Sequence, residues 1–292
     1  MKKQDTRHTH HTHDPRTIAV AGDARLVEEI TSLFEANGYT LLPAADKRAL
    51  ASAAADIAAG FELTISDSTV KKERLQFLDA HLPASTMILS SSVTVTAAGQ
   101  AAWMNHPERL IGFSAFPTLL TGPLAEIAVP VQTTDAVVRA AHALFAALGI
   151  EIVSVQDRVG MIFPGILSQV INEALFTAQQ NVASPEDIDT AMKAGAGYPL
   201  GPIEWGEKIG FASIVGLLDA MRNESGEERY RVAPLLRQLS LSGKFWHERL
   251  PAPEPVQEVL QLGDVPLVSE AAAPSAHEKK KQPRKKKSAH AK

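Results

Sequence analysis

TIAVAGDARLVEEITSLFEANGYTLL, residues 17–42, is the stretch that decides the fold. Its apolar run at Ile18–Ala21 predicts a buried strand, and Leu26–Ala36 has the apolar spacing of an amphipathic helix. A second short strand is predicted at Thr40–Leu42. A strand, a tight turn, a helix and another strand in this order form the βαβ unit of a parallel sheet.

The same alternation continues to about residue 157. Further strands are predicted at 61–65, 86–89, 110–113, 124–129 and 151–155, and further helices at 47–59, 71–80 and 136–148. Strands that alternate with helices indicate an α/β protein with a Rossmann-like, doubly wound parallel sheet.

The pattern changes after Val159, where helical segments follow one another. One broad apolar helical face begins at Ile162, and the sequence SPED at residues 184–187 predicts a helix start with Ser184 as its N-cap. More helices are predicted at 203–209, 212–221 and 234–239. We therefore expect a Rossmann-like domain at residues 17–157 and an all-helical domain at 158–250, between a disordered His-rich leader (1–16) and a disordered Pro-rich and basic tail (251–292).

The composition narrows the class of protein. Apolar residues make up 45% of the 292 residues, and no apolar run approaches the length of about 20 that a membrane span requires. The polar N-terminus does not resemble a signal peptide, so we expect a cytoplasmic protein. Because the chain has no cysteine, it has no disulfides, no cysteine nucleophile and no thiolate metal site. The histidines of the leader can chelate a metal, but we interpret the leader as a solvated segment and predict no metal site.

Charge is divided unevenly along the chain. Residues 279–292 carry eight basic and no acidic side chains, whereas residues 1–278 carry 21 basic and 33 acidic ones, a formal charge of −12. An acidic body argues against a nucleic-acid-binding domain, which needs a positive surface. The only contact with nucleic acid or another anionic polymer that we expect is a weak one through the basic tail.

The turn after the first strand departs from the usual dinucleotide fingerprint. In G-x-G-x-x-G the glycines allow a sharp bend, close approach of the pyrophosphate and tight packing of helix on strand. Here the three positions hold Gly22, Ala24 and Val27, and Asp23 adds a negative charge. The acid that binds ribose after the second strand is also missing, because residues 43–45 are Pro-Ala-Ala. We therefore predict a degenerate NAD site.

Longer motifs in the second half resemble a known family. VINEALFTAQQNVASPEDIDTAMKAGAGYPLGPIEWGEKIG (170–210) is similar to the start of the C-terminal domain of 3-hydroxyacyl-CoA dehydrogenases. RYRVAPLLRQLSLSGKFW (229–246) resembles the end of that domain, and HPERLIGFSAF (106–116) resembles a strand of the nucleotide domain. The resemblance implies an NAD-binding Rossmann domain, a helical domain that forms dimers, and an acyl-CoA substrate of fatty-acid metabolism held in the cleft between them.

The family's site residues transfer unevenly to this chain. Ser114 stands where the family has its catalytic histidine, while the partner carboxylate is retained as Glu126. Pro164 replaces the substrate-contacting asparagine, and the family's Ser-Asn-Thr-Ser-Ser stretch corresponds to SSSVT, whose Ser92 and Thr94 keep hydroxyl groups. A serine hydroxyl is not a general base at neutral pH.

Three functional hypotheses follow. The first is a divergent family member that has lost hydride transfer but binds acyl-CoA, or that dimerises with itself or with an active relative. The second is an active NAD-dependent dehydrogenase with a relocated base, either His106 or a water ordered by Ser114 and Glu126. The third is a dimeric scaffold that acts through its tails.

Overall fold

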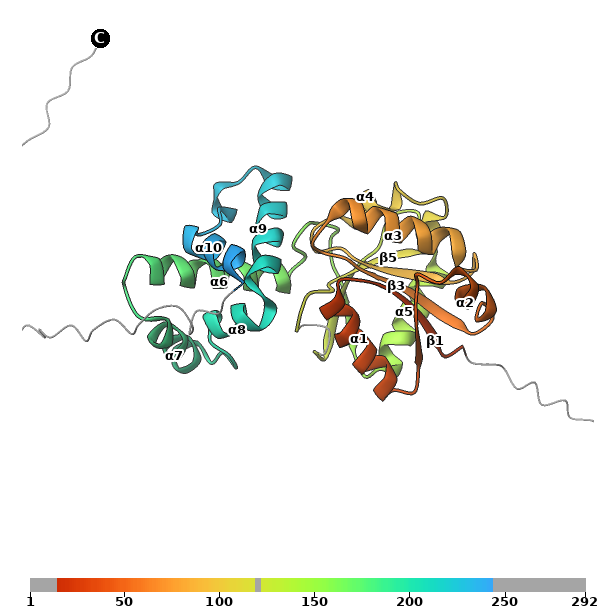
Figure 1. The fold of residues 1–292 in the computed structure, drawn as a ribbon, viewed down its shortest axis with the longest axis horizontal. Coiled ribbons are helices and arrows are strands. Elements are labelled where there is room, and N and C mark those ends of the chain that lie inside the picture. The colour runs from red at the N-terminus through yellow and green to blue at the C-terminus, as the bar shows by residue number, and fades with distance from the viewer. Residues whose placement is uncertain (1–14, 119–121, 244–292) are drawn as a thin grey trace, which may run out of the picture. The chain divides into compact units, whose positions relative to one another are not determined.

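The computed structural model describes residues 15–118 and 122–243. The first part of the described chain is a seven-stranded sheet in the order β2-β1-β3-β4-β5-β6-β7 (Figure 1). Its strands are β1 (Thr17–Gly22), β2 (Thr40–Pro43), β3 (Ile57–Leu63), β4 (Met87–Ser91), β5 (Leu110–Phe113), β6 (Leu124–Ala128) and β7 (Glu151–Ser154). This confirms the predicted α/β, Rossmann-like fold.

One strand pair differs from the expected parallel arrangement. Strands β5 and β6 are antiparallel, with Gly112 opposite Ala128 and Phe113 opposite Ile127, and the other five pairs are parallel. An antiparallel pair needs no crossover helix. The last two residues of β5 therefore pair with the last two residues of β6.

Helices cover both faces of the sheet (Figure 1). On one face lie α1 (Ala24–Ala36) and α5 (Asp135–Ala147), and on the other lie α2 (Lys47–Ser52), α3 (Ser68–His81) and α4 (Ala97–Ala101). The buried side of α1 follows the predicted spacing, with Leu26, Ile30 and Phe34 in the core. Phe34 meets Phe61 of β3 edge to face, with ring centroids 5.2 Å apart.

The largest error of the sequence prediction concerns α2 and β3. The alanine-rich run was expected to be helical over residues 47–59, but α2 ends at Ser52 and β3 already begins at Ile57. Small residues are needed in β3 because α3 and the segment after it pack closely on the strand. A Cβ atom on Gly60 would lie 2.4 Å from the Leu82 Cδ1 atom. Because alanine is the strongest helix former, the alanine-rich start of β3 has the composition of a helix and was predicted as one.

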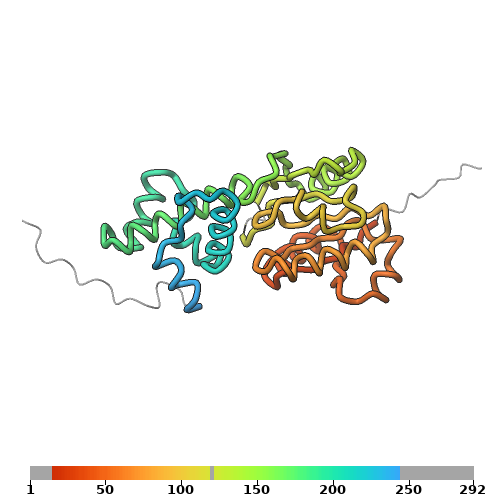
Figure 2. The backbone as a smooth tube through the Cα atoms, turned by 90° about the horizontal axis from the view of Figure 1, so that it is seen from above, coloured from red at the N-terminus to blue at the C-terminus, as the bar shows by residue number. Residues whose placement is uncertain are grey.

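The second part of the described chain is helical, as predicted, and Figure 2 follows it from green to blue. Its elements are α6 (Phe163–Gln179), α7 (Pro185–Ala196), α8 (Pro202–Ile209), α9 (Phe211–Ser225), the short 3₁₀ helix η2 (Glu228–Tyr230) and α10 (Pro234–Ser242). Ser184 caps α7, because its hydroxyl oxygen accepts a hydrogen bond from the Asp187 amide at 3.1 Å. Over the described ranges, no helix combines the length and apolarity that crossing a membrane would take.

Several predictions lie outside the described residues. They concern residues 1–14 of the His-rich leader, residues 244–250 of the expected helical domain and the whole Pro-rich and basic tail, 251–292. All of these remain predictions.

Candidate functional site

Apart from His106, the predicted site residues lie at or beyond the carboxyl ends of the parallel strands, or are brought there by hydrogen bonds. Ligands of such sheets bind at the carboxyl edge, next to the point where the strand order reverses. Here the chain leaves β1 for β2 on one side and returns as β3 on the other, so that point lies between β1 and β3. The turns after Gly22 of β1 and Leu63 of β3 meet there.

The three fingerprint positions have different surroundings. Gly22 is required by packing, because a Cβ atom on it would lie 2.4 Å from the Leu63 Cβ atom. Ala24 is the exposed first residue of α1, and Val27 is half-buried and packs against the core. The bend of the fingerprint is thus retained, while the two later positions carry side chains.

Asp23 connects the two turns at this switch point. Its carboxylate accepts hydrogen bonds from the backbone amides of Ile65 (3.0 Å) and Ser66 (3.2 Å) and from the Ser66 hydroxyl (3.0 Å). The guanidinium of Arg74 lies 3.7 Å from the same carboxylate and donates to the Thr64 hydroxyl at 2.7 Å. The negative charge of Asp23 is therefore held by donors of the β3–α3 turn.

A buried ion pair next to this switch point was missed by the sequence analysis. Glu62 of β3 and Lys71 of α3 are fully buried and in contact. The Lys71 ammonium also donates to the Thr64 carbonyl oxygen and the Ser90 hydroxyl, both at 3.1 Å. Burial lowers the pKa of Lys71, although the Glu62 carboxylate opposes this shift. An acidic residue inside an otherwise apolar strand was the signal available in the sequence.

The two predicted hydroxyl groups differ in accessibility. Ser92 is fully buried, and its hydroxyl oxygen accepts a hydrogen bond from the side-chain amide (Nε2) of Gln100 at 3.0 Å. Thr94 is half-buried, and its hydroxyl donates to the Ile65 carbonyl oxygen at 3.4 Å. Thr94 lines a depression of about 480 Å³, together with residues of the β3–α3 turn and of α9.

Ser114 and Glu126 lie opposite each other at the junction of β5 and β6. The Ser114 amide donates to the Glu126 carbonyl oxygen at 3.0 Å, and the Glu126 amide donates to the Ser114 hydroxyl oxygen at 3.0 Å. Glu126 is 3% exposed. Its two carboxylate oxygens accept hydrogen bonds from the backbone amides of Ile162 and Phe163, each at 2.7 Å. The carboxylate therefore caps the N-terminus of α6.

Pro164 lies in the first turn of the same helix and is buried. Proline is favourable at this place because its missing N–H would have no partner within the helix. The structure thus brings Ser114, Glu126 and Pro164 together, in an arrangement whose polar groups are satisfied by backbone atoms.

His106 is not part of this group. It precedes β5, at the amino edge of the sheet, whereas Ser114 follows the carboxyl end of the same strand. Its ring is 3.4 Å from the Glu108 carboxylate, and its side chain is half exposed. The other two histidines in the described ranges are His81, which ends α3 and bonds to the Phe77 carbonyl oxygen, and His142, which is exposed on α5.

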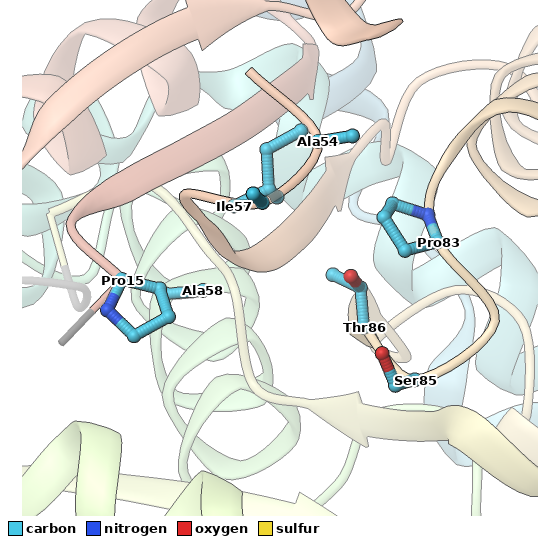
Figure 3. A pocket seen from close by; sticks show the side chains of 8 residues that line it. Pro15, Ala54, Ile57, Ala58, Pro83, Ser85 and Thr86 are labelled. Atoms are coloured by element: carbon cyan, nitrogen blue, oxygen red, sulfur yellow. The ribbon is translucent and has the colours of Figure 1, made fainter. Parts of the chain in front are cut away.

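A second depression, of about 540 Å³, lies at the amino edge of the sheet (Figure 3). It is lined by small, apolar or hydroxyl-bearing residues: Pro15, Ala54, Ala55, Ile57, Ala58, Pro83, Ser85 and Thr86. Since none of these can transfer a proton at neutral pH, this depression offers no catalytic group. Nor does any group of three or more acidic or histidine side chains within residues 15–118 and 122–243 form a possible metal site.

Two models of one protein family match the chain. The model described as 3-hydroxyacyl-CoA dehydrogenase, NAD binding domain, matches residues 18–158, and the model described as 3-hydroxyacyl-CoA dehydrogenase, C-terminal domain, matches residues 160–249.

Individual proteins match over a smaller share. A probable 3-hydroxybutyryl-CoA dehydrogenase of Bacillus subtilis is 29% identical over 182 residues, covering 62% of this chain and 63% of the relative. A 3-hydroxybutyryl-CoA dehydrogenase of Bradyrhizobium diazoefficiens is 30% identical and covers 60% of each chain. The 3-hydroxyadipyl-CoA dehydrogenase of Escherichia coli is 38% identical over 122 residues, but only 26% of its length is covered. The chain thus matches less than two thirds of each of these relatives.

The fold is shared with solved structures. The (S)-3-hydroxybutyryl-CoA dehydrogenase of Ralstonia eutropha superposes with a TM-score of 0.65 at 23% identity, over 79% of this chain and 95% of that one. At this identity the likeness concerns the fold.

Proposed function

We infer the function from one premise: this chain belongs to the 3-hydroxyacyl-CoA dehydrogenase family. On that premise we propose that it binds acyl-CoA and does not carry out NAD-dependent hydride transfer. The observation that carries the proposal is the state of Ser114 and Glu126, the two positions where the family has its histidine and glutamate.

A 3-hydroxyl group that loses a hydride must also lose its proton to a base whose pKa is near the working pH. Ser114 supplies only a hydroxyl group, and the oxygen of that group already accepts a hydrogen bond from the Glu126 backbone amide. The Glu126 carboxylate is engaged by two amides of α6. A carboxylate in this arrangement stabilises a helix terminus, and it has no imidazole at residue 114 to orient.

The surroundings of the cofactor turn support the same proposal. A pyrophosphate in the usual position would meet the Ala24 methyl group and the negative charge of Asp23. The first acid after β2 is Asp46, whose carboxylate caps α2 by accepting the amides of Arg48 and Ala49 at 2.8 and 3.2 Å. Asp46 comes three residues after the end of β2, and its Oδ1 atom is engaged at the start of α2. We propose that NAD binds weakly or not at all.

Binding of acyl-CoA and dimer formation are the functions we propose to be retained. The depression beside Thr94 is open to a ligand. The start of α6 exposes large apolar side chains, with 43% of Phe163 and 56% of Ile166 accessible. Such a cluster favours a protein contact. We propose that residues 158–250 form a dimerisation and substrate domain beside a nucleotide-type domain at 17–157, as a homodimer or with an active relative.

The second candidate is an active NAD-dependent 3-hydroxyacyl-CoA dehydrogenase. It is favoured by the match of the NAD-binding domain model over residues 18–158. In that case a water near Ser114 and Glu126 would have to act as the base, because His106 lies at the opposite edge of the sheet.

The test is an absorbance assay of NADH oxidation with acetoacetyl-CoA, run on the full chain and on Glu126→Ala. Our proposal predicts no turnover above the rate without enzyme. Turnover that disappears in Glu126→Ala would establish the active enzyme instead. If neither NADH nor acetoacetyl-CoA is bound or turned over, removal of residues 251–292 tests the scaffold hypothesis. That hypothesis requires the shortened chain to lose partner binding.

A further inference from the structure

We propose that Asp23 occupies, as an internal anion, the donors that would otherwise face a bound pyrophosphate, and that this residue excludes dinucleotides from the switch point between β1 and β3. The inference rests on the proposed function, because it names the residue that would exclude the cofactor from this family member.

The donors form a set suited to an anion. Two consecutive backbone amides, those of Ile65 and Ser66, and the Ser66 hydroxyl converge on the Asp23 carboxylate at 3.0–3.2 Å. The Arg74 guanidinium stands 3.7 Å away. Amides, a hydroxyl and a guanidinium are the groups that proteins direct at phosphate oxygens. Here they face a carboxylate of the same chain.

Asp23 lies where a dinucleotide would bind. Asp23 is the N-cap of α1 and follows the last residue of β1, so it stands at the point of sheet reversal. Its side chain is 27% exposed, so the charge is partly accessible to solvent. A pyrophosphate entering the turn would compete with this charge for the same amides and be repelled by it.

Neighbouring polar side chains of α1 are also engaged. Arg25 donates to the carbonyl oxygens of Lys208 and Ile209 at the end of α8. Glu29 accepts the Thr118 amide at 2.9 Å. The first turns of α1 thus make internal contacts with three other segments of the chain, and Asp23 is the one of these residues whose charge faces the switch point.

The experiment is calorimetric titration of the full chain with NADH, in the wild type, Asp23→Ala and Asp67→Ala. Asp67 is the matched control, because it lies in the β3–α3 turn that supplies the donors to Asp23, and it also accepts hydrogen bonds from two backbone amides, those of Thr69 and Val70, at the start of α3. Asp23→Asn is the second variant if Asp23→Ala does not fold, since it removes the charge and keeps the shape. Thermal melts of the same three proteins with added inorganic phosphate test whether the site binds a phosphate group alone.

We expect NADH to bind Asp23→Ala at least about tenfold more tightly than the wild type, with phosphate raising the melting temperature of that variant alone. Equal NADH affinity in all three proteins, or the same gain in Asp67→Ala, would overturn the inference. The proposed function has a separate readout in the same samples. Wild type that binds NADH tightly without acetoacetyl-CoA turnover refutes the exclusion of NAD, including the role of Asp23, and leaves the proposed loss of hydride transfer standing. Turnover refutes that proposed loss.

Discussion

Replacing Glu126 by alanine separates the structural role of this residue from a catalytic one. The carboxylate is 3% exposed and accepts the Ile162 and Phe163 amides at 2.7 Å each, while its own amide donates to the Ser114 hydroxyl. Glu126→Ala removes both acceptors and leaves the backbone hydrogen bonds of the β5–β6 pair in place. The loss is therefore confined to the cap of α6.

The magnitude follows from these two bonds. Loss of a side-chain cap costs about 0.5–2 kcal/mol, and each amide left buried without a partner costs about 1–3 kcal/mol. Water entering the vacated space recovers part of that cost, so we expect Glu126→Ala to lower the free energy of unfolding by about 3 kcal/mol. In a domain of this size that corresponds to a fall in melting temperature of about 6–12 °C. Glu126→Gln, which keeps one acceptor oxygen, is expected to lose about half as much.

The assay is urea denaturation followed by circular dichroism, with Ser114→Ala as the control. Ser114→Ala removes one acceptor of the neighbouring amide and is expected to cost about 1 kcal/mol. An unchanged unfolding midpoint in Glu126→Ala, together with a loss of acetoacetyl-CoA turnover, would refute the capping role and make Glu126 catalytic.

Three further predictions concern single residues. Ser114→His places the family's base in the strand, but we expect no NADH-dependent turnover from it, because the Glu126 carboxylate remains bound to α6; turnover in the absorbance assay would contradict this. Lys71→Met leaves Glu62 buried without its partner, so the free energy of unfolding should fall by about 3–5 kcal/mol, and adding Glu62→Gln should recover part of it in urea melts. Burial raises the pKa of the Asp189 carboxyl above 3.8, so the folded state holds this proton more tightly than the unfolded chain. The resulting stabilisation is complete below pH 3.8 and lost as the pH rises through the raised pKa, and the stability of the wild type relative to Asp189→Asn should fall over that interval in melts at stepped pH.

The elements of the fold were predictable where side-chain pattern and burial agree. All seven strands were expected, and β5 has the predicted bounds, Leu110–Phe113. The predicted bounds were wrong at β3, which begins at Ile57, because alanine and glycine carry little strand signal and the close packing of Gly60 against Leu82 is not visible in the sequence. The prediction also missed the reversed direction of β6, because hydropathy does not encode strand direction.

The sequence indicated candidate site residues, but it did not indicate their contacts. The sequence indicated Ser114, Glu126 and Pro164 one by one, and the fold brings them together. That Glu126 binds the amides of α6 depends on residues 36 and 37 positions further along the chain, which no local pattern reveals. The same holds for Asp23, whose partners lie 42 and 43 positions away.

The most direct test of the proposed function is a calorimetric titration of the purified full chain at low salt, first with NADH and then with acetoacetyl-CoA. We predict no binding heat with NADH and saturable binding of acetoacetyl-CoA. Micromolar binding of NADH would contradict the argument from Asp23, Ala24 and Asp46. Absence of heat with both ligands would contradict acyl-CoA binding itself.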